Sequence, residues 1–168
     1  MIKDKNLTLA ITGLRAQKLP WGFNENDKRF QKMKTQVTEY LIKFIKNGYS
    51  TFYDGMALGF DLIALEILID LKIKYPYIKI IGAMPCPNQD AKWTRAEKER
   101  YKNIKEQIDQ SIVVSEKYYG KECMLKRNRF IVDNSDMLFA LWDGTPGGTM
   151  YTIEYAKSQN KPVVIIEP

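Results

Sequence analysis

The chain has 168 residues, a hydrophobic share of 45% and a formal net charge of +6. This composition favours one globular domain with a sizeable core and argues against disorder. The chain contains no His and only two Cys, which excludes Ser-His and Cys-His nucleophiles and argues against a zinc site or a disulfide framework. Lysines on predicted helices supply most of the positive charge, and we interpret them as solvated helix faces.

No apolar run approaches the ~20 residues of a membrane span. The first residues are charged and lead straight into a strand-like segment, without the pattern of a signal peptide. We therefore expect a cytoplasmic protein with no membrane partner, whose thiols, Cys86 and Cys123, stay reduced.

Short apolar runs alternate along the chain with longer segments of helical spacing. In residues 28–46, for example, the apolar positions include Phe30, Met33, Val37 and Leu41. In chain order, strands are predicted at 7–11, 50–53, 78–84, 112–114, 137–142 and 163–166, and helices at 28–46, 61–74, 93–110, 121–134 and 150–159. The alternation predicts an α/β fold, a Rossmann-like three-layer sandwich of one domain, residues 1–168, with a mainly parallel sheet and helices on both faces.

In open parallel sheets, ligands bind beyond the carboxyl ends of the strands. The first predicted strand ends at Thr12 and Gly13, where the glycine permits a tight turn. Arg15 follows and can fork onto a phosphate. A plain strand exit with a surface arginine explains these residues equally well.

The second predicted strand leads into DGMALGFD, residues 54–61, which opens a helix. Backbone amides beside Asp54, between Gly55 and Gly59, can cradle a phosphate or a ribose. Asp61 stands where a helix N-cap is expected, and capping explains it as well as ligand contact does. Because GK[ST] and GxGxxG are both missing, the segment specifies neither ATP nor NAD.

Two further elements can approach the same edge of the sheet. The third strand ends in a rigid, proline-rich exit at Pro85, and Trp93 follows, which we interpret as an anchor for its helix rather than a base-stacking residue. Arg127 and Asn128 lie on the helix before the fifth strand. They can reach a ligand from one side, or Arg127 can be a surface arginine like its basic neighbours.

The segment DGTPGGT, residues 143–149, is the most specific loop of the chain. A glycine-rich loop between a strand and a helix presents free backbone N–H groups at the positive end of the helix, which suits a phosphate. Asp143 ends the strand and is expected to face the crevice. The candidate ligand residues here are Asp143, Gly144, Gly147, Gly148 and Thr149, and Glu154 follows either as a functional acid or as an exposed one.

The motifs TGxR, DGxAxGFD, a proline-rich exit with Trp, RN and DGxxGGTxYxxxYA follow one another from residue 12 to residue 156. This order resembles the SLOG superfamily, and within it the YpsA-like group, also called DUF1273. Its members are Rossmann-like domains that bind nucleotides or nucleotide-derived molecules, several of them as sensors of signalling nucleotides, and homo-oligomers are common among them. The resemblance implies a pocket lined by Thr12, Gly13, Arg15, Gly55, Gly59, Asp61, Arg127, Asn128, Asp143, Gly148 and Thr149.

A second branch of the superfamily, the LOG-type phosphoribohydrolases, carries an Arg-Lys pair and then PGGxGTxxE. In this chain Arg127 precedes Asn128, and PGGTMYTIE keeps the Pro, both Gly and the Glu but has Met150 and Tyr151 in place of Gly and Thr. The bulk of Met150 hinders the close backbone approach that glycine permits. If the chain is an enzyme, the resemblance implies that Glu154 and Arg127 cleave the N-glycosidic bond of nucleotides.

Three functions result, in order of preference. The first is binding of a nucleotide or nucleotide-derived small molecule, as a sensor or by sequestration, without a metal or cofactor. The second is hydrolysis of nucleoside 5′-monophosphates. The third is binding of single-stranded nucleic acid, as in the related DprA proteins; the net charge allows it, but aromatic residues do not interleave with basic ones, so nucleic acid is not the expected partner.

Overall fold

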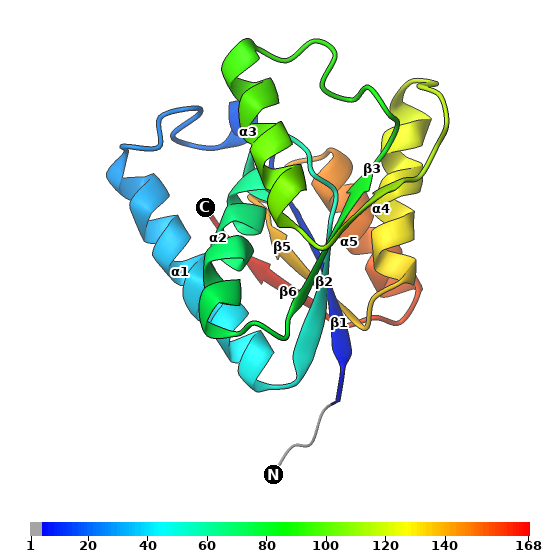
Figure 1. Ribbon diagram of the computed structural model, residues 1–168. Coiled ribbons are helices and arrows are strands. Elements are labelled where there is room, and N and C mark those ends of the chain that lie inside the picture. The colour runs from blue at the N-terminus through cyan, green and yellow to red at the C-terminus, as the bar shows by residue number, and fades with distance from the viewer. Residues whose placement is uncertain (1–4) are drawn as a thin grey trace.

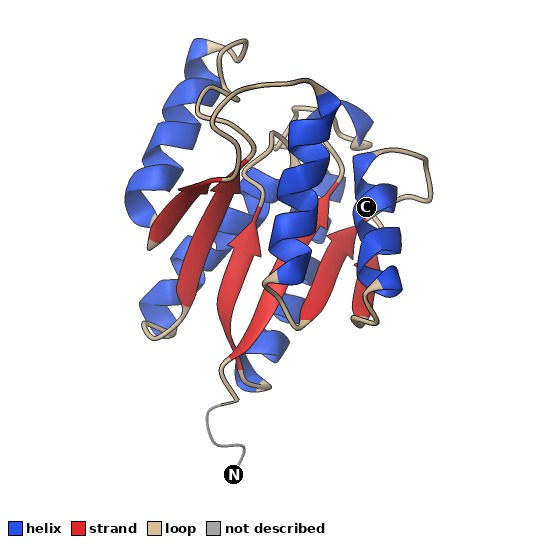
Figure 2. Cartoon of the chain, turned by 90° about the vertical axis from the view of Figure 1, so that its right-hand side faces the viewer, coloured by secondary structure: helices blue, strands red, loops and turns tan. Residues whose placement is uncertain are grey.

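The strands form one parallel sheet in the order β4-β3-β2-β1-β5-β6 in the computed structural model, which describes residues 5–168 (Figures 1 and 2). They are β1 (Leu7–Gly13), β2 (Tyr49–Asp54), β3 (Lys79–Met84), β4 (Gln110–Val113), β5 (Met137–Leu141) and β6 (Val163–Ile166). The chain first winds outward from β1 to β4, and then resumes on the other side of β1 with β5 and β6. The point of reversal, between β1 and β5, is the place where doubly wound sheets bind ligands.

The helices are η1 (Ala16–Lys18), α1 (Lys28–Lys46), α2 (Phe60–Lys74), α3 (Arg95–Gln107), α4 (Lys121–Asp133) and α5 (Gly148–Ser158). Right-handed crossovers put α1, α2 and α3 on one face of the sheet and α4 and α5 on the other (Figure 1). The predicted Rossmann-like three-layer fold is therefore confirmed. No helix within residues 5–168 combines the length and the apolar character that a membrane crossing requires.

The larger of two core clusters lies between the sheet and α1 and α2, and the smaller one lies between the sheet and α4 and α5. Every residue of β5 is buried, and Phe139 at its centre meets the rings of Phe44 and Phe60 at centroid distances of 5.2 and 6.4 Å. α2 packs between α1 and α3 and buries most of its circumference, as its nearly continuous apolar sequence predicts.

The largest departure from the predicted helix bounds is in α3. α3 stops at Gln107 and not at residue 110, because Ile108 is extended and its side chain joins the core. Asp109 then fixes the turn: its carboxylate accepts hydrogen bonds from the backbone N–H of Ile80 (2.8 Å) and from Lys72 Nζ. Gln110 consequently begins β4.

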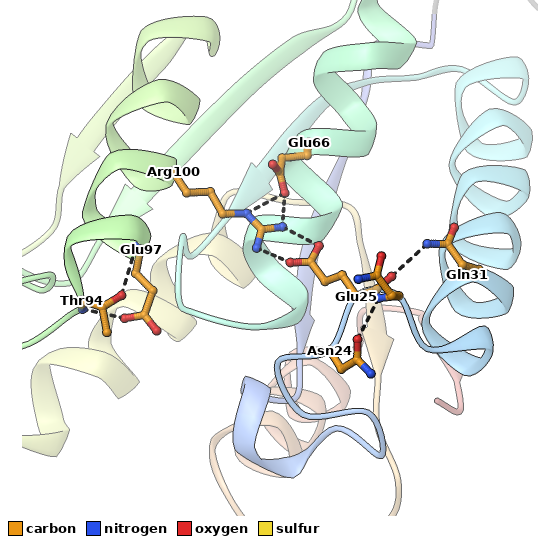
Figure 3. A network of polar contacts seen from close by, with 8 residues as sticks. Asn24, Glu25, Gln31, Glu66, Thr94, Glu97 and Arg100 are labelled. Carbon is orange, nitrogen blue, oxygen red and sulfur yellow. Dashed lines mark hydrogen bonds and ion pairs between the residues drawn. The ribbon is translucent and has the colours of Figure 1, made fainter.

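Arg100 connects three segments on the outer side of the α1–α2–α3 layer (Figure 3). From α3, its guanidinium binds Glu66 of α2, with Nε donating to Oε1 at 3.0 Å, and Glu25 of the loop before α1, with Nη1 donating to Oε2 at 2.7 Å. These ion pairs line a groove of about 700 Å³. Because Arg100 is paired with both Glu25 and Glu66, we assign this network a packing role.

Candidate functional site

The loops after β1, β2 and β5 meet at the carboxyl edge of the sheet. The N–H of Leu14 donates to the carbonyl of Leu141 (3.2 Å), and the N–H of Phe60 donates to the carbonyl of Leu14 (3.1 Å). Lys18 Nζ donates to the carbonyl of Pro146 at 2.9 Å. These contacts join the three loops into one rim, hereafter the rim, at the point where the strand order reverses.

Gly13 and Gly59 have packing reasons of their own within the rim. A Cβ on Gly13 would lie 2.2 Å from Cδ1 of Phe60. Gly59 has a φ of 106°, and a Cβ there would lie 2.7 Å from the carbonyl oxygen of Leu14. Both glycines let the loop after β2 lie directly against the loop after β1, so neither one requires a ligand to explain it.

A buried ionic cluster lies under the rim. Asp54, Asp61 and Arg127 expose 0%, 7% and 2% of their surface. The guanidinium of Arg127 donates from Nη1 to the carbonyl of Gly55 and from Nε to Oδ1 of Asn128, the latter at 2.8 Å. A Cβ on Gly55 would lie 2.8 Å from Nε of Arg127, so this glycine makes room for the arginine.

The predicted N-cap role of Asp61 is wrong. The N-cap of α2 is Gly59, and Asp61 lies within the first turn. Its carboxylate turns back and accepts a hydrogen bond from the N–H of Ala57 at 3.2 Å. Asp61 therefore fixes the DGMALGFD loop beside Arg127 instead of capping the start of α2.

The two acids of the cluster share one buried cation. Burial, and then the nearby charge of Asp61, raise the pKa of Asp54 well above its usual value. Burial also raises the pKa of Asp61 to about 6, although Arg127 and Arg15 oppose that rise. Oδ2 of Asp54 and Oδ1 of Asp61 are buried without a hydrogen-bond partner among the described residues. A proton held on Asp54 leaves Asp61 to balance the charge of Arg127 at neutral pH.

The amino end of α5 is open to an anion. Its N-cap is Gly147, with a φ of 152°, and no side chain caps the helix. A Cβ on Gly147 would lie 2.7 Å from Nζ of Lys18, and one on Gly148 would lie 3.9 Å from Nδ2 of Asn128. Free backbone N–H groups, an ammonium and an amide thus meet at the positive end of one helix.

Arginine side chains add positive charge beside this helix end. Arg15 is exposed, and its charge opposes the rise that burial causes in the pKa of Asp61 and adds to the fall that burial causes in the pKa of Arg127. Arg127, by contrast, is buried, and its Nε and Nη1 are bonded to Asn128 and to backbone carbonyls. The rim can therefore hold a multiply charged anion by forked hydrogen bonds from arginine and by helix amides.

The other predicted ligand residues lie around the rim with different exposure. Thr12, Pro85 and Thr149 are buried, whereas Gly144 is exposed with a φ of 90°. Asp143 is exposed, and it accepts hydrogen bonds from both the N–H and the hydroxyl of Thr145, which lower its pKa. Its Oδ1 thus shapes the turn after β5, and the charge of Lys18 adds to the lowering of its pKa.

Glu154 stands apart from the rim residues. It is exposed, on the side of α5 opposite the buried residues Thr149, Thr152, Ile153 and Ala156. Its carboxylate forms no hydrogen bond or ion pair with another residue of the described chain. Arg127 and Glu154 are therefore not brought together in this structure.

Lys18 is the rim residue that the sequence did not indicate. It belongs to η1, which at three residues is too short to produce a periodic pattern. Its only signal in the sequence is its place in the loop after β1, shortly after Arg15.

Within residues 5–168, no group of three or more His, Cys, Asp or Glu residues is arranged to hold a metal ion.

The reversed parallel sheet and the polar rim at its switch point define a doubly wound Rossmann-like domain. The chain belongs to the YspA SLOG family, whose YpsA model matches residues 9–166. UPF0398 protein YpsA of Bacillus subtilis is 30% identical over 157 residues, which cover 90% of this chain and 87% of that protein. UPF0398 protein BH1768 of Halalkalibacterium halodurans is 28% identical over 155 residues, covering 91% of this chain and 82% of the relative.

Two solved structures share the fold. DNA processing protein A of Helicobacter pylori, known for its single-stranded DNA binding mode, superposes with a TM-score of 0.64 and 23% identity over 95% of this chain. DNA processing protein A of Streptococcus pneumoniae gives a TM-score of 0.59 and 16% identity over 94% of this chain. The chain spans only 65% and 50% of those two proteins, and at these identities the likeness concerns the fold.

Proposed function

We propose that the rim binds the phosphate of a nucleotide or of a nucleotide-derived small molecule. The observation that carries the proposal is the uncapped amino end of α5, at Gly147, with Lys18 and Asn128 beside it. A doubly wound sheet binds nucleotides at this place, outside the strand ends at the switch point. The family model, which spans the same elements, supports the choice.

The phosphate would lie against the backbone N–H groups of Gly148 and Thr149, where the partial positive charge of the helix favours an anion. Arg15 and Lys18 would neutralise its remaining charge from the loop after β1. The buried cluster under the rim would fix the position of Arg127 and, through it, of Asn128. This division leaves the inner acids to orient the site and the outer cations to bind the ligand.

Isothermal titration with nucleoside 5′-monophosphates and diphosphates, each beside its parent nucleoside, tests the proposal. We expect the phosphorylated compounds to bind more tightly than the nucleosides. Lys18→Ala and Arg15→Ala should each weaken the phosphorylated compounds by about tenfold, the loss of one charge-assisted contact. Lys102→Ala, an exposed lysine of α3, is the matched control and should bind as the native protein does. Equal affinity for nucleotide and nucleoside would refute the proposed phosphate-binding site.

A second candidate is single-stranded nucleic acid. It draws on the likeness to DNA processing protein A of Helicobacter pylori, which binds single-stranded DNA. Exposed aromatic side chains, Phe23 after β1 and Tyr118 and Tyr119 after β4, lie in loops at the carboxyl edge, where strand-binding proteins use such rings to stack bases. Retention of an oligonucleotide that falls steeply with salt would favour this candidate, because released counterions give that dependence.

Nucleotide hydrolysis stays a separate hypothesis. It requires a carboxylate close to the glycosidic carbon, whereas Glu154 is exposed on the outer side of α5. Incubation of the protein with each nucleoside 5′-monophosphate, followed by chromatography for free base, decides whether this reaction occurs.

A further inference from the structure

A second pocket lies at the same edge of the sheet, between the loops after β3 and β4. It has a volume of about 290 Å³ and is lined by side chains of both loops and of the first turn of α4. The two loops, green before α3 and yellow-green before α4, lie at the same end of the molecule in Figure 1. Resting on the proposed function, we propose that this pocket receives the nucleobase of the ligand whose phosphate occupies the rim.

The walls of the pocket suit a flat aromatic ring. Trp93 from the loop after β3 and Tyr118 from the loop after β4 both line it, together with the thioether of Met124. Trp93 is held edge-to-face by Tyr101, with ring centroids 5.0 Å apart, while Tyr118 is 61% exposed and has no hydrogen bond to another described residue. A rigid ring and an available one from two different loops can stack on a base of any identity.

Polar groups in the pocket can bind the edge of a base. Gln89 donates from Nε2 to the carbonyl of Met56 and to the hydroxyl of Tyr101, both at 3.0 Å. Because a carbonyl can only accept, the first bond fixes the orientation of the amide and leaves Oε1 of Gln89 as a free acceptor. The side chain of Asn88, also in the lining, forms no hydrogen bond with the described residues and offers both a donor and an acceptor.

The pocket is connected to the rim by two routes. Gln89 binds the carbonyl of Met56, the residue after Gly55, whose own carbonyl accepts from Arg127. On α4, Met124 lines the pocket, and Arg127 follows three residues later, about one helical turn along the axis. Both routes join the pocket to the buried cluster under the rim, beside which the phosphate would lie.

The function that Trp93 has in packing its helix does not exclude this use. Its contact with Tyr101 holds one part of the indole, and the side chain remains half-buried and in the pocket wall. Trp93 can thus anchor the start of α3 and present a fixed surface to a base.

Tyr118→Ala is the sharpest test, because this exposed side chain can be removed without disturbing the core. Titrations of AMP and of ribose 5-phosphate separate the base from the phosphate. We expect Tyr118→Ala to weaken AMP by about five- to 150-fold, the effect of removing one stacking ring, and to leave ribose 5-phosphate unchanged. Tyr77→Ala is the control: Tyr77 is 63% exposed and lies before β3, at the opposite edge of the sheet.

Two outcomes separate this inference from the proposed function. If AMP and ribose 5-phosphate bind equally well and Tyr118→Ala changes neither affinity, the base pocket is refuted, whereas the phosphate-binding site is supported. If neither AMP nor any other nucleoside mono- or diphosphate binds, the proposed function fails, and a short oligodeoxyadenylate then decides about the pocket. Weaker binding of that strand to Tyr118→Ala, with loss of its fluorescence quenching in Trp93→Phe, would assign the base to a nucleic-acid strand; no change in either variant would refute the pocket.

Discussion

Arg127→Met tests whether the buried cluster supports the rim. The substitution keeps a long apolar stem but removes the guanidinium, and with it the hydrogen bonds to the carbonyl of Gly55 and to Asn128. Asp54 and Asp61 are then left buried with no cation between them. Removing one member of a buried ion pair costs about 3–5 kcal/mol, because the remaining charge is uncompensated. In a chain of this length each kcal/mol shifts Tm by about 2–4 °C, so Tm should fall by roughly 6–20 °C.

The loss of stability in Arg127→Met should depend on pH. Arg127 lowers the pKa of both acids, so its removal raises both values further. An acid with a raised pKa in the folded state contributes stability at low pH and loses it as the pH rises through that pKa. The deficit of Arg127→Met should therefore be small near about pH 5 and largest near about pH 8, and Asp61→Asn added to Arg127→Met should recover much of it.

Thermal unfolding followed by circular dichroism at both pH values measures these effects. Arg95→Met, which removes an exposed arginine of α3, is the matched control and should change stability by no more than about 0.5 kcal/mol. A loss in Arg127→Met below about 1 kcal/mol, or a deficit that is the same at both pH values, would refute the argument.

Three other predictions concern single residues. Asp54→Asn should gain stability relative to the native protein as the pH rises above about 4, the pKa of an unfolded Asp, because the pKa of Asp54 is raised by burial; urea unfolding across that range checks it, and a relative loss would contradict it. Gly59→Ala should cost more than the roughly 1–3 kcal/mol of backbone strain, because its Cβ would also meet the backbone of the β1 loop. Gly120→Ala, with a φ of 78° and no atom within 4 Å of the Cβ position, should cost the strain alone, and equal losses in the two variants would be inconsistent with the packing found here. Glu154→Gln should leave nucleotide binding unchanged, and a release of free base that only the native protein catalyses would instead establish the hydrolase.

The local spacing of apolar residues predicted the helices and strands of the fold. The helix at residues 28–46 and the strand at residues 163–166 were predicted with the bounds that the structure has, since apolar spacing is a property of neighbouring residues. The end of α3 was not, because a tertiary contact decides it: Ile108 leaves the helical pattern to enter the core.

The rim was predictable as a place but not as a set of interactions. Parallel strands bring their following loops to one edge, so the glycine loops and Arg15 could be assigned to the same region. The partners of Arg127 could not, because the carbonyl of Gly55 lies 72 residues away in the chain. The sequence also does not reveal that Gly13 and Gly59 make room for neighbouring backbone and side chains.

The position of the phosphate is the central claim, and backbone amide resonances report it most directly. In ¹⁵N-labelled protein titrated with a nucleoside 5′-monophosphate, we expect the largest chemical-shift changes at the N–H groups of Gly147, Gly148 and Thr149, with Arg15 next. Changes confined to the groove lined by Arg100 on the α1–α2–α3 layer, or no change at the amino end of α5, would contradict the account.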